Sequence, residues 1–130
     1  MARISFDSTI PVLRIFSLEK AREFYVDYLG FEVDWEHRFE EGAPLYMQVS
    51  RDGLVLHLTE HHGDATPGSR IFVHIRGLDL LLREIAGHDY RHLNPSIEEA
   101  PWGGRVMELI DPFGNRLCFA EAAADDGADT

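Results

Sequence analysis

The spacing of apolar and polar residues in the first half of the chain predicts one helix among four strands. Residues 10–15 alternate like a strand, and apolar residues recur at helical spacing over residues 18–28, after Ser17, a good N-terminal cap. Gly30 stands where a left-handed residue commonly ends a helix. The first half is therefore expected to fold as a βαβββ unit. Its three later strands, separated by turn formers, are expected at residues 31–38, 45–50 and 54–60.

The second half of the chain repeats this order of elements. Residues 70–76 alternate as a strand, and a short helix is expected over residues 78–86, ended by Gly87. A long loop is expected at residues 94–104. The pattern is again βαβββ. Its three later strands are expected near residues 90–93 and at residues 105–110 and 115–120.

The two halves are also similar in sequence. Residues 53–60 align without a gap on residues 114–121, sharing the leading glycine, a central leucine (Leu56 and Leu117) and the closing glutamate. Self-similarity at a long fixed period indicates a duplicated unit. We therefore expect an α+β fold in a single domain. Its expected parts are unit one at about 8–60, a linker at 61–69 and unit two at about 70–121, within a domain of residues 1–121.

Composition and charge exclude several classes of protein. The 130-residue chain has 23 acidic and 12 basic residues and a net charge of −11, which argues against a nucleic-acid partner because phosphate contacts need Lys and Arg. No apolar run reaches signal-peptide or membrane-spanning length, so no membrane partner is expected. A single cysteine, Cys118, excludes an internal disulfide and fits a cytoplasmic location. The Ala- and Asp-rich residues 122–130 are expected to form a disordered acidic tail.

Each predicted strand presents two different faces. Ile71, Val73 and Ile75 form an aliphatic row suited to packing under a helix, whereas the alternate positions carry arginine, phenylalanine and histidine. A sheet face that mixes polar and aromatic groups is either solvated or lines a ligand cavity. Because the two sheets are expected to be pseudo-symmetric, we favour a ligand cleft shared by both.

Two sequence motifs make the chain resemble a known superfamily. They are LEKAREFY followed by LGF within residues 18–31, and DPFGN at residues 111–115. Together with the doubled βαβββ pattern, they resemble the glyoxalase, bleomycin-resistance and ring-cleaving dioxygenase superfamily, also called vicinal oxygen chelate, over residues 8–121. The tripeptide Pro101-Trp102-Gly103 is most similar to the bleomycin-resistance branch. The resemblance implies a fold of two tandem βαβββ units.

The resemblance also implies where a metal would bind. Metal-dependent members place their ligands at positions that correspond here to Ile10, His57, Arg70 and Cys118. Ile10 cannot ligate, and the guanidinium of Arg70 repels a cation. The two remaining groups fall short of the three protein ligands that catalytic metal sites generally need. We therefore expect no metal cofactor.

The resemblance to bleomycin-resistance proteins implies an acidic homodimer that sequesters a cationic, partly aromatic drug without modifying it. Such binding needs aromatic surfaces, orienting polar groups and a negative field. Core or dimer packing explains the aromatic candidates of unit one equally well, and arginines on the same face would favour an anionic ligand. The candidate ligand-binding residues are Trp35, Phe39, Tyr46, His57, Arg70, Phe72, Trp102, Glu108 and Cys118.

Two enzyme hypotheses stand beside the binding protein. One is a metal-dependent lyase, isomerase or dioxygenase of the glyoxalase type with unusual ligands. The other is an enzyme that works without metal, with His57 or Glu108 as a base. No catalytic residue follows from the residues themselves. The sequence therefore favours a metal-independent small-molecule binding protein.

Overall fold

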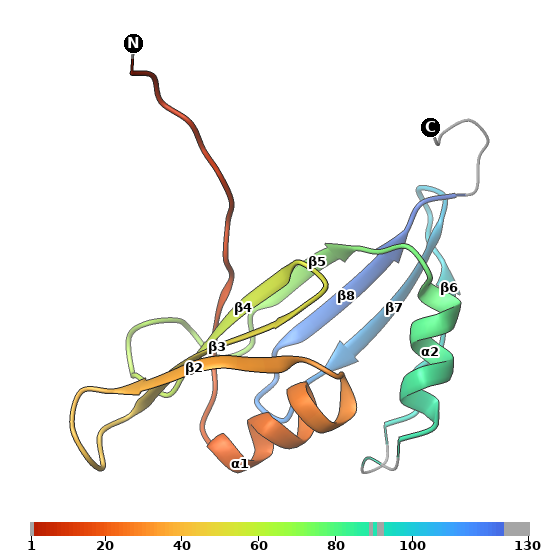
Figure 1. Cartoon of the computed structure of the whole chain (residues 1–130). Coiled ribbons are helices and arrows are strands. Elements are labelled where there is room, and N and C mark those ends of the chain that lie inside the picture. The colour runs from red at the N-terminus through yellow and green to blue at the C-terminus, as the bar shows by residue number, and fades with distance from the viewer. Residues whose placement is uncertain (1, 89, 91–92, 124–130) are drawn as a thin grey trace.

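Each half of the chain folds into a four-stranded sheet with a helical segment after its first strand (Figure 1). The computed structural model describes residues 2–88, 90 and 93–123. The first half contains β1 (Val12–Arg14), α1 (Leu18–Ala21), η1 (Arg22–Tyr28), β2 (Glu32–Arg38), β3 (Leu45–Arg51) and β4 (Leu54–Thr59). The second half contains β5 (Arg70–His74), α2 (Leu78–Ala86), β6 (Glu98–Glu99), β7 (Arg105–Ile110) and β8 (Arg116–Glu121).

The two sheets have the same topology. Their strand orders are β1-β4-β3-β2 and β5-β8-β7-β6. In each sheet the first strand pairs in parallel with the last strand of its unit, and the other pairs are antiparallel. This arrangement confirms the predicted α+β fold of two tandem βαβββ units.

The first helical segment begins and ends where the sequence predicts. The Ser17 hydroxyl accepts a hydrogen bond from the backbone N–H of Lys20 at 3.1 Å, and Gly30 adopts a φ of 77° just after the segment. After its first turn the helix continues as the π-helix η1, whose i→i+5 pattern appears where Leu29 N–H donates to the Phe24 carbonyl. The buried side chains of η1 are all aromatic: Phe24, Tyr25 and Tyr28.

Alternation along the strands separates two faces in both sheets. Met47 and Leu58 of the first sheet and Met107 and Phe119 of the second are at most 4% exposed and pack with the helices. These apolar rows form one core that both halves share. In Figure 1, α1 lies below the sheets, and the opposite faces are left uncovered by it. Burial of the apolar rows is the main favourable contribution to folding.

A buried hydrogen-bond network joins the two halves. The Asp111 carboxylate, 4% exposed, accepts from the Tyr25 hydroxyl at 2.6 Å and from the Asn115 side-chain amide at 2.9 Å. The Asn115 amide also donates to the Arg14 carbonyl of β1, and its oxygen accepts from the Ser69 N–H that precedes β5. The network therefore holds η1 and β1 of the first half against the β7–β8 turn of the second.

The sixth strand lies elsewhere than predicted. It is β6 (Glu98–Glu99), inside the expected loop, where it pairs with β7. The strand expected near residues 90–93 is wrong for Tyr90 and Leu93, which are in neither helix nor strand, and the rest of that segment lies outside the described residues. The Tyr90 ring stacks on Tyr28 of η1 with a centroid separation of 4.7 Å. Its apolar character therefore reflects packing on a helix and not strand pairing.

The described residues before β1 contribute no side chain to this core. Residues 2–10 extend away from the sheets (Figure 1), with Ile4 and Phe6 of this arm 87% and 97% exposed. Most of the predicted acidic tail, residues 124–130, lies outside the described residues. Within the part of the chain that the structure describes, no helix has the length and hydropathy needed to span a bilayer.

Replacing Tyr25 with Phe is expected to destabilise the fold, because it removes the hydroxyl that donates to the buried Asp111 carboxylate. Burial and the neighbouring Asp111 charge raise the pKa of Tyr25, so the hydroxyl keeps its proton at neutral pH. Losing a hydrogen bond to a charged group costs about 1.5–3 kcal/mol. Urea unfolding of the wild type and Tyr25→Phe would measure this difference in the free energy of unfolding.

Tyr28→Phe is the matched control for that measurement. Tyr28 lies on the same helix, and its hydroxyl has no hydrogen-bond partner among the described residues. Its loss should change the free energy of unfolding by less than about 0.5 kcal/mol. Equal destabilisation by the two substitutions would contradict the role assigned to the Tyr25–Asp111 bond.

Candidate functional site

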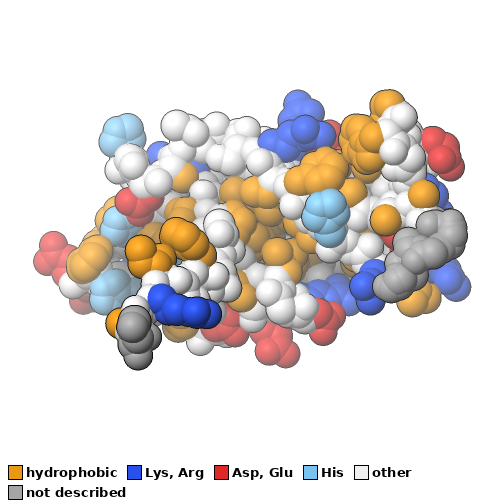
Figure 2. Space-filling view, turned by 90° about the horizontal axis from the view of Figure 1, so that it is seen from above, with side chains coloured by type: hydrophobic (Ala, Val, Ile, Leu, Met, Phe, Trp, Pro, Cys, Tyr) orange, Lys and Arg blue, Asp and Glu red, His pale blue; other side chains and the backbone are white. Residues whose placement is uncertain are grey.

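The open face is the side of each sheet that the helices leave uncovered. Strand register places alternate residues there: Phe72 of β5 pairs with Cys118 of β8, which pairs in turn with Glu108 of β7. In the first sheet, His57 of β4 pairs with Gln48 of β3. Seen from above, hydrophobic side chains gather along the middle of the molecule, with charged side chains mostly around the edge (Figure 2).

Four candidates gather on the first sheet, and we call them the aromatic cluster: Trp35, Phe39, Tyr46 and His57. The Trp35 and Tyr46 rings are stacked, with centroids 6.0 Å apart and planes 8° from parallel. His57 meets both rings edge-on, at 5.3 and 5.2 Å. Phe39 is 77% exposed and joins the cluster through His61, at 5.8 Å. The cluster offers a ligand a flat aromatic surface with polar edges.

A β-bulge turns Trp35 toward this cluster. Val33 of β2 lies opposite Val49, on the covered face, yet Trp35, two residues later, lies opposite Gln48 on the open face. In a regular strand, residues two apart point to the same face, so Trp35 would have pointed into the core. The extra residue, Asp34, reverses the alternation and leaves Trp35 42% exposed.

Both ring nitrogens of His57 are engaged. Nδ1 lies 2.8 Å from the Tyr46 hydroxyl, and Nε2 lies 3.0 Å from Gln48 Oε1. The Gln48 amide nitrogen donates to the Asp34 carboxylate at 2.9 Å, which leaves Oε1 as the atom facing the imidazole. His57 therefore donates from Nε2 and accepts from Tyr46 at Nδ1. Burial lowers the pKa of His57, which favours this neutral tautomer.

The other five candidates gather on the second sheet, and we call them the mixed cluster: Arg70, Phe72, Trp102, Glu108 and Cys118. Arg70 Nε donates to the Glu108 carboxylate at 3.2 Å, and Arg116 lies 3.4 Å from its other oxygen. The Phe72 ring lies 6.0 Å from the Arg70 guanidinium carbon and 6.1 Å from the Trp102 ring. Trp102 is 66% exposed and therefore free to stack on a ligand.

Cys118 is the buried member of the mixed cluster. It is 2% exposed and lies between Phe72 and Glu108 in the strand register. Burial raises the pKa of its thiol, so the sulfur keeps its proton. Nucleophilic attack and metal binding both require the thiolate. Cys118 therefore supports the sheet and does not present a reactive group to a ligand.

The nine candidates fall into two separate clusters in one chain. Among the described residues, no hydrogen bond, ion pair or ring contact joins the aromatic cluster to the mixed cluster. A cavity of about 400 Å³ does lie between the two halves, but none of the nine candidates lines it. The expectation of one cleft shared by both sheets is therefore not met by that cavity.

Two residues that support the aromatic cluster, Gln48 and Asp34, are not among the candidates from the sequence. Gln48 orients His57, and its own amide is oriented by Asp34. Hydrogen bonds from Gln48 and Ser50 lower the pKa of Asp34, which keeps it an acceptor. Strand alternation could have found Gln48, which is two residues from Tyr46. No sequence signal marks Asp34, because its position depends on the bulge.

The donor atoms of the residues that the structure describes do not fit a catalytic metal site. Within the described residues, no three His, Cys, Asp or Glu side chains come together as a group that could hold a metal ion. Of the positions that the resemblance marks, Ile10 has no donor atom and Arg70 is paired with Glu108. The third, His57, already uses both ring nitrogens.

Two βαβββ units with polar and aromatic groups on their open faces define a duplicated ligand-binding fold. The chain belongs to the glyoxalase superfamily: the model of that family, described as glyoxalase superfamily protein, matches residues 1–126. This match confirms the superfamily that the two sequence motifs indicated.

Similar proteins belong to the bleomycin-resistance branch of the superfamily. The bleomycin resistance proteins of Geobacillus stearothermophilus and Staphylococcus aureus are each 26% identical over 125 residues, covering 85% of this chain and 93% of theirs. The bleomycin-binding protein of Streptomyces verticillus, solved with copper(II)-bleomycin, is 27% identical with a TM-score of 0.65, covering 95% of this chain and 100% of that one. The bleomycin resistance determinant of transposon Tn5 shares the fold at 21% identity and a TM-score of 0.69, covering 92% and 100%.

The hydrogen bonds of His57 lead to a prediction for NMR. The imidazole is expected to titrate below its ordinary pKa of 6.5, because burial disfavours the charged form. At pH 7 its ¹⁵N shifts should show a protonated Nε2 and an unprotonated Nδ1 that accepts a hydrogen bond. A pKa above 6.5, or a proton on Nδ1, would contradict the arrangement with Tyr46 and Gln48.

Proposed function

We propose that this protein binds and sequesters a small-molecule drug of the bleomycin type, without a metal cofactor and without chemical change to the drug. The observation that carries the proposal is the stacked Trp35–Tyr46 pair beside a neutral His57 whose ring nitrogens are both bonded. This arrangement suits contact with a planar ligand group and leaves no free base to act on it.

The mixed cluster supplies the polar part of the proposed site. The exposed Trp102 offers a second stacking surface, next to Phe72. Glu108 provides a carboxylate on the same face, although it is shared between Arg70 and Arg116. The net charge of −11 would draw a cationic drug toward the protein. Aromatic surfaces, orienting polar groups and a favourable field are the properties that such binding needs.

The similar proteins support the same class of ligand. The Streptomyces verticillus protein, which is similar over 95% of this chain, binds copper(II)-bleomycin. A second bleomycin-binding protein, solved with bleomycin, has the same fold with a TM-score of 0.66. The metal in the former complex is named as part of the drug, copper(II)-bleomycin.

We also propose that the protein is a cytoplasmic homodimer. Three large apolar side chains of the open faces are 42–44% exposed in the single chain: Trp35, Phe72 and Ile110. Contact between the open faces of two copies would cover them and would let the aromatic cluster of one chain complete the mixed cluster of the other. The single, unpaired Cys118 is consistent with a reducing compartment.

A metal-dependent lyase, isomerase or dioxygenase is the second candidate function, favoured only by membership in the superfamily. It would need His57 to release a hydrogen bond and Cys118 to lose a proton in a buried position. Both changes cost free energy, so the binding function has the stronger support.

Calorimetric titration with metal-free bleomycin is the test of drug binding. Trp102→Ala is expected to weaken binding about tenfold, because an exposed tryptophan is a common source of binding energy. Trp102→Phe keeps an aromatic ring and should lose much less. Treatment of the protein with a chelator, followed by dialysis, should leave the Kd unchanged. Absence of binding at high micromolar drug would refute the proposal, and loss of binding after chelation would favour the metal-dependent alternative.

Sedimentation equilibrium tests the dimer. The wild type is expected to be dimeric at tens of micromolar protein, whereas Ile110→Lys should be mostly monomeric. The added lysine would place a charge in the apolar contact, next to Arg116, its partner in the strand register. Arg83→Gln on α2 is the control, since this exposed residue lies off the open face. A wild-type monomer at these concentrations would contradict the proposed dimer.

A further inference from the structure

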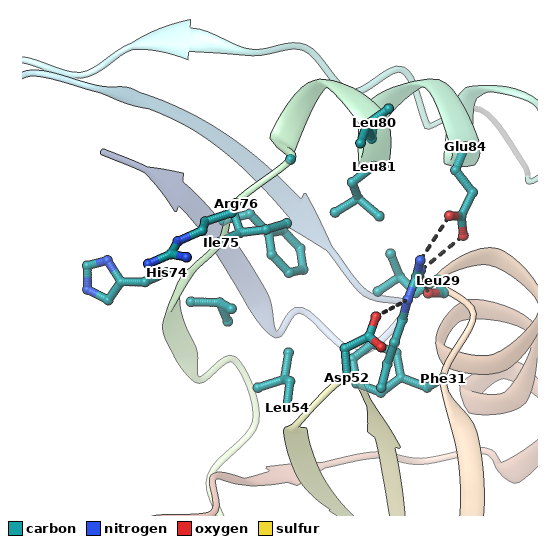
Figure 3. Close-up of a pocket in the computed structure, with 14 residues that line it drawn as sticks. Leu29, Phe31, Asp52, Leu54, His74, Ile75, Arg76, Leu80, Leu81 and Glu84 are labelled. Atoms are coloured by element: carbon teal, nitrogen blue, oxygen red, sulfur yellow. Dashed lines mark hydrogen bonds and ion pairs between the residues drawn. The ribbon is translucent and has the colours of Figure 1, made fainter. Parts of the chain in front are cut away.

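The cavity between the two halves is a different feature from the aromatic and mixed clusters (Figure 3). It has a volume of about 400 Å³. Pockets that bind small molecules typically measure about 300–1,000 Å³, so this cavity is large enough for a small organic molecule. The first half contributes residues near the end of η1 and around the β3–β4 turn, and the second contributes residues of β5, α2 and β8.

The second sheet lies between most of this cavity and the mixed cluster. Val73 and Phe119 line the cavity, whereas their neighbours in sequence, Phe72 and Cys118, belong to the mixed cluster. Successive residues of a strand point to opposite faces. A molecule in the body of the cavity would therefore touch the helix side of the sheet. At the Arg76 end, His74 also lines the cavity, and its ring lies 5.8 Å from the Phe72 ring, so this end reaches the edge of the mixed cluster.

The walls of the cavity are mainly aliphatic. In Figure 3, Leu81 of α2 and Leu54 of β4 approach the cavity from opposite sides, with Leu29 and Ile75 at its flanks. Leu80, also on α2, lines the cavity and is 64% exposed, so the apolar lining continues to the surface. Such a surface favours the hydrocarbon part of a ligand.

One end of the cavity is closed by a pair of charged side chains from the two halves. The Arg51 guanidinium makes two hydrogen bonds to the Glu84 carboxylate, at 2.9 and 3.0 Å, and a third to the Leu29 carbonyl at 2.7 Å. Asp52 also lies 3.7 Å from Arg51 Nε. The Arg51 guanidinium at this end of the cavity is therefore already paired and is not available to a ligand.

The other end of the cavity carries a cation without a partner. Arg76 is exposed and makes no hydrogen bond or ion pair with any residue that the structure describes. Figure 3 shows it beside His74, across the cavity from Glu84. The nearby N–H groups of Gly77 and Leu78 are already bonded to the Glu121 carboxylate. Arg76 is therefore the group that an anionic ligand would meet.

We propose that this cavity is a second binding site, which takes a small aliphatic carboxylate. The hydrocarbon part of the ligand lies against Leu54 and Leu81, and its carboxylate pairs with Arg76. The proposal does not rest on drug binding at the mixed cluster, because none of the five residues of that cluster lines the cavity.

Titration with octanoate, followed by methyl NMR, tests the proposal. Octanoate is expected to cause saturable shifts in the methyl groups of Leu54, Val73, Ile75 and Leu81. 1-Octanol has the same hydrocarbon chain without the charge. It should bind about three- to fivefold more weakly, which corresponds to the free energy of one exposed ion pair. Octylammonium should bind more weakly still, because it is positively charged like Arg76 and the two charges repel.

Variants separate the charge from the apolar wall. Arg76→Gln should weaken octanoate binding about three- to fivefold and leave 1-octanol binding unchanged. Leu80→Glu, at an exposed helix position that should not disturb folding, should weaken octanoate about tenfold or more by repulsion and loss of apolar contact. Arg83→Gln removes a positive charge from the same helix outside the cavity and is expected to leave octanoate binding unchanged.

Three results would overturn the proposal. They are the absence of saturable shifts up to millimolar octanoate, equal binding of octanoate and octylammonium, and shifts confined to the open face. Trp102→Ala should not alter octanoate binding, and octanoate should not compete with bleomycin. These experiments can therefore refute the second site without refuting the proposed drug site, and the reverse also holds.

Discussion

A buried carboxylate, that of Asp111, holds the two halves of this molecule in one arrangement. The apolar core that they share favours contact but is not directional, so it would tolerate small shifts of one half against the other. The hydrogen bonds of Asp111 with Tyr25 and Asn115 are directional, and a buried carboxylate without partners would be costly. Because Asn115 also binds the backbone at Arg14 and Ser69, the network sets the relative positions of η1, β1 and β5. The placement of both open faces and of the cavity between the halves depends on it.

The two sides of the sheets are suited to different tasks. On the open face, rings and polar groups are positioned by cross-strand neighbours within one sheet, as Gln48 positions His57 and Glu108 positions Arg70. The geometry of each cluster is therefore fixed by its own sheet, and Trp35 and Trp102 are exposed in the single chain. On the helix side, the cavity is lined by both halves, and the Arg51–Glu84 ion pair bridges the halves at one end of it. A ligand on the open face would leave this contact between the halves undisturbed.

Much of the fold could be predicted from the sequence because its signals are local. Ser17 and Gly30 mark the ends of the first helical segment through one hydrogen bond and one positive φ. The sixth strand was misplaced because the aromatic character of Tyr90 resembles a strand signal, whereas its ring packs on Tyr28. The candidate binding residues could be chosen from their residue types. The face of the sheet on which Trp35 lies depends on a β-bulge, which the alternation of apolar and polar residues in the sequence does not reveal.

The sequence by itself determined the duplicated βαβββ architecture and the family, since these follow from residue types and short-range patterns. Only the tertiary structure decided that the candidates split into two clusters, that His57 carries its proton on Nε2, and that a cavity lies beside Arg76. These features arise from strand register and from contacts between segments distant in the chain. The register is set when the strands of one sheet pair, and the cavity forms only when the two halves pack together, so no local pattern of residues encodes either.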